Sequence, residues 1–286
     1  MHKQLISAKE LQSLVSEGHI VVLDARYSLT DPNAGYQQYK NGHIPGSLFL
    51  FQGSDLCSTP TGSNGRHPLP NPQELKQRLL NAGITPNSHI VVYDADTSTF
   101  SVRAWWVLKW LGFSNVSVLD GGMQSWLNIN GNLSKGEGKT LGQLVSSNKN
   151  KFTPQMPTVN ASQVLNSIDT NRFKLIDARN TERYAGQTEP LDPVAGHIPG
   201  ALNRPISANL NSNGTFKSAQ QLKNEFNQLL SNIPANQVVH YCGSGITACH
   251  NLFAMELAGL NGSFLYPGSW SEWCSDKNRP VATGTS

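Results

Sequence analysis

The stretch that decides the fold reads Val238-Val239-His240-Tyr241-Cys242-Gly243-Ser244-Gly245-Ile246-Thr247. Its β-branched start is typical of a buried strand, and the segment after Thr247 has the spacing of an amphipathic helix. Between them, Gly243 and Gly245 permit backbone angles that turn successive N–H groups toward one point. A helix N-terminus carries about half a positive charge, so we expect it to hold Cys242 as a nucleophilic thiolate.

The chain repeats one unit, and three pairs of segments carry the repeat. They are residues 21–26 (VVLDAR) with 174–179 (KLIDAR), 42–47 (GHIPGS) with 196–201 (GHIPGA), and 89–94 (HIVVYD) with 237–242 (QVVHYC). The first two pairs are offset by 153 and 154 residues, which indicates two copies of one fold. In the N-terminal copy, Asp94 takes the place of Cys242.

We therefore expect two domains, residues 1–135 and 158–286, joined by a linker of residues 136–157 that is rich in Gly, Lys, Ser and Asn. Within each copy, short β-branched runs alternate with segments of helical period. Strands separated by helices need crossover connections, so each domain should be α/β, a mainly parallel sheet with helices on both faces. Ligands of such sheets bind at the carboxyl ends of the strands, where Cys242 should lie.

Composition narrows the classes of function. The 286 residues carry a net charge of +3 with scattered Lys and Arg, which gives no support for nucleic-acid binding. The chain has no apolar run of about 20 residues for a membrane span and no apolar N-terminal signal, so we expect a cytoplasmic protein. The four cysteines follow neither metal-site nor disulfide spacing, so we expect no metal and no cofactor.

The repeat and the loop together resemble the rhodanese superfamily, in particular its tandem-domain sulfurtransferases, in which the C-terminal copy carries the cysteine. Residues 242–247 (CGSGIT) are similar to the C-G-S/T-G-V-T loop of the 3-mercaptopyruvate sulfurtransferases. Thiosulfate-specific members have C-R-K-G-V-T instead. Thiosulfate is a compact dianion that needs charge beside the sulfur, whereas neutral Gly243 and Ser244 suit a keto acid whose carboxylate lies several atoms from its thiol.

The resemblance implies that the Cys242 thiolate attacks the sulfur of 3-mercaptopyruvate, forms a persulfide and releases pyruvate. It also implies that backbone N–H groups of the loop stabilise the developing negative charge. These are the N–H groups of Gly243, Gly245, Ile246 and Thr247. Arg183 matches the family arginine that binds the substrate carboxylate, although a solvated surface arginine is the alternative.

A second substrate arginine, which some members carry after an E-P dipeptide, is absent from the segment Glu189-Pro190-Leu191-Asp192. Three other arginines are candidates to replace it, and the sequence does not rank them: Arg66, Arg103 and Arg179. Because Arg179 directly follows the end of the expected strand at Asp177, it could equally form a structural ion pair.

Eukaryotic members of the family are thought to use a Ser-His-Asp triad to handle protons. Ser244 matches the serine, and His67, in residues 65–70 (GRHPLP), matches the histidine, with an exposed loop histidine as the alternative. The position that aligns with the Asp is Gly53, so Asp55 is the substitute candidate. His43 and His197 occur in both copies, including the copy without a cysteine, so a structural role is expected for them.

Several alternatives remain open. The enzyme could be a thiosulfate–cyanide sulfurtransferase, or the chain could be a non-catalytic rhodanese-like binding module. A phosphatase of the C-x5-R type is disfavoured, because the position six residues after Cys242 is Ala248 and not an arginine. The sulfur acceptor could be thioredoxin, another thiol or cyanide, and a monomer is the simplest expectation.

Overall fold

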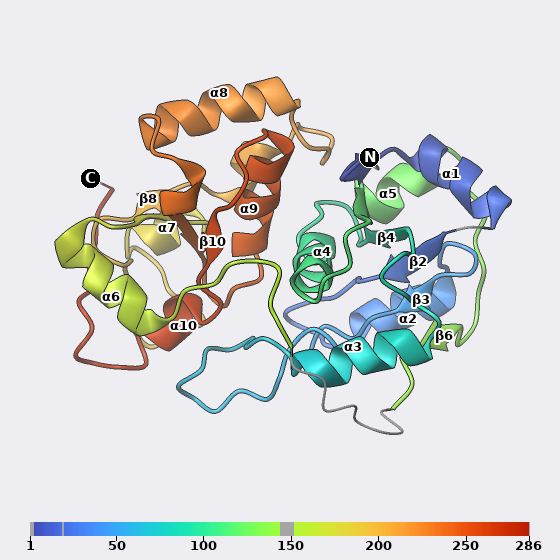
Figure 1. Ribbon diagram of the computed structural model, residues 1–286, viewed down its shortest axis with the longest axis horizontal. Helices are drawn as coiled ribbons and strands as arrows, with labels where there is room; N and C mark the ends of the chain where they lie inside the picture. Colours follow the sequence, from blue (N-terminus) through green and yellow to red (C-terminus); the bar gives the residue numbers. More distant parts are fainter. Residues whose placement is uncertain (1–2, 19, 144–151, 286) are drawn as a thin grey trace. The chain divides into compact units, whose positions relative to one another are not determined.

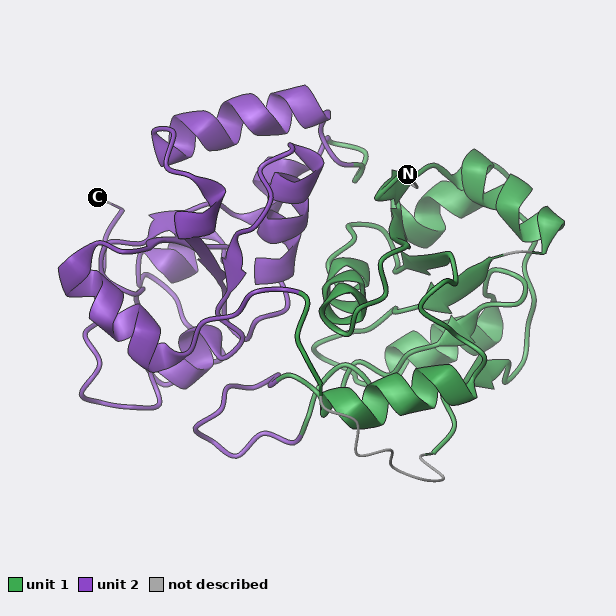
Figure 2. Ribbon diagram, in the orientation of Figure 1, with its two compact units in different colours: residues 1–58, 69–155, 212–215 green, residues 59–68, 156–211, 216–286 purple. Residues whose placement is uncertain are grey.

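The computed structural model describes residues 3–18, 20–143 and 152–285 and divides into two compact units (Figure 2). Unit 1 comprises residues 1–58, 69–155 and 212–215; unit 2 comprises residues 59–68, 156–211 and 216–286. Residues 59–68 thus belong to the unit that holds Cys242, although they precede most of unit 1 in sequence. Part of the expected linker, residues 144–151, lies outside the described residues.

Unit 1 is a parallel sheet with helices on both of its faces (Figure 1). Its elements are β1 (Leu5–Ile6), α1 (Ala8–Glu17), β2 (Val21–Asp24), α2 (Ala34–Asn41), β3 (Leu48–Phe49), α3 (Pro72–Asn81), β4 (Ile90–Tyr93), α4 (Ser101–Trp110), β5 (Val116–Leu119), α5 (Gly122–Asn128) and β6 (Lys139–Thr140). The strand order is β1-β5-β4-β2-β3-β6, and neighbouring strands are parallel. The strand β6 extends this sheet from within the expected linker, because its backbone pairs with β3.

Unit 2 repeats the pattern. Its elements are α6 (Ala161–Thr170), β7 (Lys174–Asp177), α7 (Thr181–Tyr184), β8 (Leu202–Asn203), η1 (Ile206–Asn209), α8 (Ala219–Leu230), η2 (Ala235–Gln237), β9 (Val238–Tyr241), α9 (Ala248–Leu257), β10 (Phe264–Leu265) and α10 (Ser269–Trp273). The parallel strands lie in the order β10-β9-β7-β8. Asp177 is in register with Tyr241, as Asp24 is with Tyr93 in unit 1, so the sequence repeat is also a structural one.

Successive side chains of a central strand point to opposite faces of the sheet, and helices cover both faces. In unit 1, Val91 and Tyr93 pack into a core with Leu11 of α1 and Trp126 of α5, while α4 packs on β4 and β5. In Figure 1, α1 and α5 lie on one side of β2 and β4, and α3 lies on the other. Because both faces are covered, the strands read as continuous apolar runs.

The helix α9 differs from the amphipathic helix that its sequence predicted. Every residue from Ala248 to Met255 is buried. The cause is that α9 is covered on two sides, by the sheet strands β9 and β10 and by α8. A helix that is apolar all round is typical of such a buried position, and the cysteine loop ends where this helix begins, at Ala248. No helix in the described ranges combines the length and apolar character of a transmembrane span.

Candidate active site

The cysteine loop begins where β9 ends and closes at the start of α9. Cys242 is 1% exposed, and the backbone N–H of Gly245 donates a hydrogen bond to its Sγ at 3.1 Å. Ile246 is buried, Thr247 is half-buried, and Ala248 begins the helix. An N–H group that points at the sulfur stabilises negative charge there, so the loop has the form that a nucleophilic thiolate requires.

The loop is braced by α10 and by Pro267, two residues before that helix. The N–H of Trp270 donates to the carbonyl of Cys242 at 2.9 Å. Gly245 has a φ of +83°, and a Cβ on it would lie 2.4 Å from the carbonyl oxygen of Pro267. Position 245 therefore requires glycine for both its backbone angle and its close approach to a neighbouring carbonyl.

Two of the candidate catalytic residues lie in direct contact. His67 Nδ1 lies 2.7 Å from Ser244 Oγ, a hydrogen-bond distance across 177 positions of sequence. His67 comes from residues 59–68, the segment that is part of unit 2. The segment approaches closely because Gly65 has no side chain: a Cβ there would lie 2.7 Å from the carbonyl oxygen of Gly268. Ser244 and His67 can thus share a proton beside the cysteine loop.

Two arginines converge above Gly243. A Cβ on this glycine would lie 3.0 Å from Arg66 Nη2 and 3.4 Å from both Nη1 and Nη2 of Arg183. Arg66 Nη1 bonds to Asp192, and Arg183 bonds through Nε and Nη2 to Glu189. Arg66 Nη2 and Arg183 Nη1 have no hydrogen-bond partner in the part of the chain that is described. They are donors available to an anion next to Cys242.

Glu189 and Asp192 are site residues that the sequence reasoning missed. Asp192 Oδ2 lies 3.4 Å from Arg183 Nη2, and Glu189 Oε1 accepts the N–H groups of Leu191 and Asp192. Burial alone would raise the pKa of Glu189, but hydrogen bonds from Arg183 and Leu191, with the charges of Arg183 and Arg179, lower it on balance. The sequence signal for them is the pair of carboxylates within residues 189–192, the segment that lacks the second family arginine.

Arg179 is held by structural partners. Its guanidinium contacts both oxygens of Asp177, Glu189 Oε2 at 3.2 Å and the carbonyl of Gly196 at 2.7 Å. It also lies over the ring of Trp270, 4.8 Å from the centroid. Because these partners occupy all three of its nitrogens, Arg179 fits the structural alternative better than that of a substrate cation.

The repeated segments make the same contacts in both units. In unit 1, Arg26 bonds to Asp24 as Arg179 does to Asp177. His197 Nδ1 lies 2.8 Å from the carbonyl of Tyr184, and His43 has the same contact with its own tyrosine. His43 and His197 thus make the same structural contact in the two units, which agrees with the structural role expected for them.

Two other candidates lie in unit 1. Asp55 Oδ1 lies 2.7 Å from Arg78 Nη2, and its Oδ2 accepts the N–H of Phe51 at 2.8 Å. Burial raises the pKa of Asp55 despite these contacts. Arg103 is buried in α4, with Nη2 3.4 Å from the carbonyl of Leu56. Asp55 and Arg103 therefore have local partners within their own unit, whereas Ser244, His67, Arg66 and Arg183 are assembled in unit 2.

The position in unit 1 that corresponds to Cys242 holds a buried carboxylate. Asp94 Oδ1 accepts the N–H of Ser98 at 3.1 Å, and Oδ2 accepts those of Phe100 and Ser101 at 2.8 and 3.2 Å. Burial raises the pKa of Asp94 to about 6 in spite of these bonds. The loop in unit 1 thus also directs backbone N–H groups toward one site, but the carboxylate of Asp94 occupies that site.

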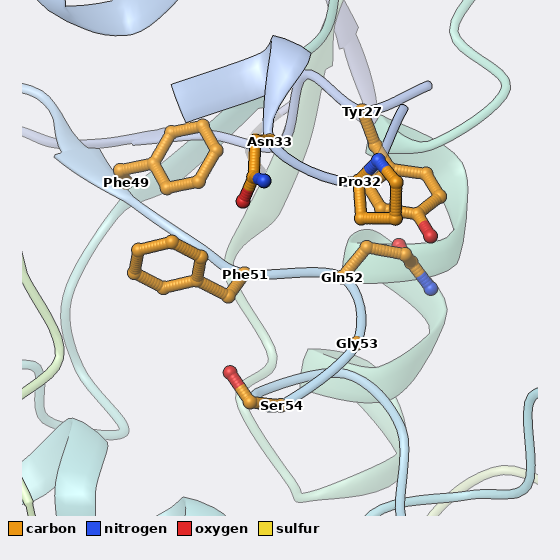
Figure 3. Close-up of a pocket in the computed structure, with 8 residues that line it drawn as sticks. All are labelled: Tyr27, Pro32, Asn33, Phe49, Phe51, Gln52, Gly53 and Ser54. Carbon is orange, nitrogen blue, oxygen red and sulfur yellow. The ribbon is translucent and has the colours of Figure 1, made fainter. Parts of the chain in front are cut away.

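Unit 1 also contains a pocket at the carboxyl ends of β2 and β3, with a volume of about 240 Å³ (Figure 3). It is lined by Tyr27, Pro32, Asn33, Phe49, Phe51, Gln52, Gly53 and Ser54. In Figure 3 the rings of Phe49 and Phe51 lie side by side, and Tyr27 lies near Pro32 and Gln52. None of the lining side chains is charged or is a thiol, so this pocket lacks the groups of the Cys242 site.

Several known proteins are similar to this chain over nearly its whole length. A probable 3-mercaptopyruvate sulfurtransferase of Pseudomonas aeruginosa is 43% identical, over 98% of both chains. A putative thiosulfate sulfurtransferase, SseB of Mycobacterium tuberculosis, is 38% identical over 98% of this chain and 97% of its own. The crystal structure of SseA from Escherichia coli, described as a 3-mercaptopyruvate sulfotransferase, superimposes with a TM-score of 0.74 at 29% identity, over 94% of this chain and 99% of its own.

The family model for the rhodanese-like domain matches the chain twice, at residues 7–129 and 160–276. The two matches fall on the two copies of the sequence repeat, and the second contains the cysteine loop with Arg183. Together with the similarity over nearly the whole length, they establish that the chain belongs to the rhodanese family, as a protein with two rhodanese-like domains in tandem.

Proposed function

We propose that the chain is a sulfurtransferase that takes sulfur from 3-mercaptopyruvate through a persulfide on Cys242. The observation that carries the proposal is the convergence of Arg66 Nη2 and Arg183 Nη1 above Gly243, the residue that follows Cys242 in the loop. Two N–H donors in this place fit a single carboxylate a few atoms away from the reacting thiol. The names of the similar proteins from Pseudomonas aeruginosa and Escherichia coli support the same donor.

Cys242, Ser244 and His67 account for every bond and proton that changes in this reaction. The Cys242 thiolate attacks the thiol sulfur of the donor, a sulfur–sulfur bond forms, and the carbon–sulfur bond breaks with its electron pair on carbon. The proton of the donor thiol passes to the Ser244–His67 pair and from there to the enolate carbon. The products are pyruvate and the Cys242 persulfide anion, and the loop N–H groups stabilise the anionic sulfur throughout.

A nucleophilic acceptor then removes the outer sulfur and regenerates the thiolate. A thiol such as that of thioredoxin, another thiol, or cyanide meets this chemical requirement. We place the reaction in the cytoplasm because four free cysteines, all buried, suit a reducing compartment. We also propose that the protein acts as a monomer, since one chain supplies both rhodanese-like domains.

The test is a comparison of two donors at equal ionic strength, with 3-mercaptopyruvate and thiosulfate each at saturating and limiting concentrations. The proposal expects the larger kcat/KM with 3-mercaptopyruvate. A larger kcat/KM with thiosulfate would favour the second candidate, a thiosulfate–cyanide sulfurtransferase, which the name of the Mycobacterium tuberculosis relative supports. No sulfur transfer from either donor would favour a non-catalytic binding module.

A further inference from the structure

Asp192 is fixed between the two arginines that face the cysteine loop. Its Oδ1 bonds to Arg66 Nη1, its Oδ2 lies 3.4 Å from Arg183 Nη2, and its N–H donates to Glu189 Oε1 at 3.2 Å. The side chain is 3% exposed. It is therefore a buried part of the site, unlike a solvated surface ion pair, and water screens its charge only weakly.

The charges around the site cancel. The guanidiniums are those of Arg66, Arg179 and Arg183, and the carboxylates in ion-pair contact with them are those of Asp177, Glu189 and Asp192. The two free nitrogens above Gly243 thus offer hydrogen bonds without a surplus of positive charge behind them. Such a site accepts a single carboxylate by geometry, whereas a dianion finds no second charge to balance it.

We propose that Asp192 is the residue that selects a donor with one negative charge over a donor with two. It does so by cancelling the charge of Arg66 and Arg183 while it orients their free nitrogens toward the loop. This inference rests on the proposed function, because it explains how a site with two arginines prefers 3-mercaptopyruvate to thiosulfate. It assigns the selection to a side chain outside the cysteine loop.

The experiment removes the negative charge of Asp192 and keeps a side chain of nearly the same shape. Asp192→Asn should raise kcat/KM for thiosulfate relative to that for 3-mercaptopyruvate by about tenfold or more, because one buried unit charge is removed a few ångströms from the donor. The matched control is Asp276→Asn, which removes the same charge from the same unit at a side chain that is 44% exposed and 3.7 Å from Arg279. The control should leave the donor ratio unchanged.

The outcomes separate the two proposals. The donor ratio of the unaltered protein tests the proposed function, and the change of that ratio in Asp192→Asn tests the role of Asp192. If the variant lowers kcat/KM for both donors by the same factor, Asp192 only orients the arginines and the inference is overturned. If the variant does not fold, inhibition of the unaltered protein decides: pyruvate, a monoanion, should compete at lower concentration than sulfate, and the reverse order would overturn the inference.

Discussion

Replacing Gly243 with alanine places a methyl group where the donor carboxylate is expected to bind. The new Cβ would lie 3.0 Å from Arg66 Nη2 and 3.4 Å from two nitrogens of Arg183. Ordinary contact distances are about 3.5 Å or more, so the Arg66 guanidinium must retreat by roughly 0.5 Å. It can do so without disturbing the fold, because its side chain is 31% exposed.

The expected loss is that of one hydrogen bond between charged groups. Such a bond contributes about 1.5–3 kcal/mol, which corresponds to a rise of about 10- to 150-fold in KM for 3-mercaptopyruvate. The turnover number kcat should change little, because the bond from Gly245 N–H to Cys242 Sγ does not involve position 243. The assay is the steady-state release of pyruvate with a saturating thiol acceptor.

The matched control is Gly142→Ala, because a Cβ at Gly142 would meet nothing within 4 Å. This variant should show the KM and melting temperature of the unaltered protein. If Gly243→Ala kept its KM while it remained folded, the donor carboxylate would not bind above Gly243. The convergence of Arg66 and Arg183 would then be structural, and the basis for choosing this donor would fail.

Two further predictions concern titratable groups. His67→Gln keeps a hydrogen-bonding partner for Ser244 but cannot take up a proton, so kcat should fall by about 100-fold and its dependence on pH should change. An unchanged pH–rate profile would exclude His67 from proton transfer. Asp94 has a pKa raised to about 6 in the folded state, so its contribution to stability is full below the pKa of the unfolded carboxyl and is lost as the pH rises through 6. Between pH 4 and 6, urea unfolding should therefore show the unaltered protein losing about 2 kcal/mol relative to Asp94→Asn, and parallel pH curves would contradict this.

The fold was predictable, and Cys242 could be proposed as the nucleophile, because their signals are local. The repeated strand ends at Asp24 and Asp177 and the glycines around Cys242 each act within a few residues, so the sequence displays them directly. The resemblance to the rhodanese family gave Arg183, and it gave Ser244 and His67, which the structure brings to 2.7 Å. The family model and the full-length relatives confirm the family and the fold class.

Other features of the site and the fold could not be predicted, because they depend on contacts between residues that are far apart in sequence. Asp192 and Arg66 are 126 residues apart, and neither has a neighbour in sequence that indicates their ion pair. Residues 59–68 pack with unit 2 because Gly65 allows a close approach to Gly268, a fact that only the three-dimensional structure contains. The strand β6 forms because the open edge of β3 accepts any extended backbone, whatever its side chains.

The proposed reaction requires that the Cys242 sulfur accept a second sulfur, and the mass of the intact protein measures this directly. After incubation with 3-mercaptopyruvate and removal of the donor, we predict that the protein gains the mass of one sulfur atom and that peptide mapping places it on Cys242. Cyanide should remove the added mass, and Cys57→Ser, a change at another buried cysteine, should gain it as the unaltered protein does. A protein that releases pyruvate without this gain, or carries the added sulfur on another cysteine, would contradict the account.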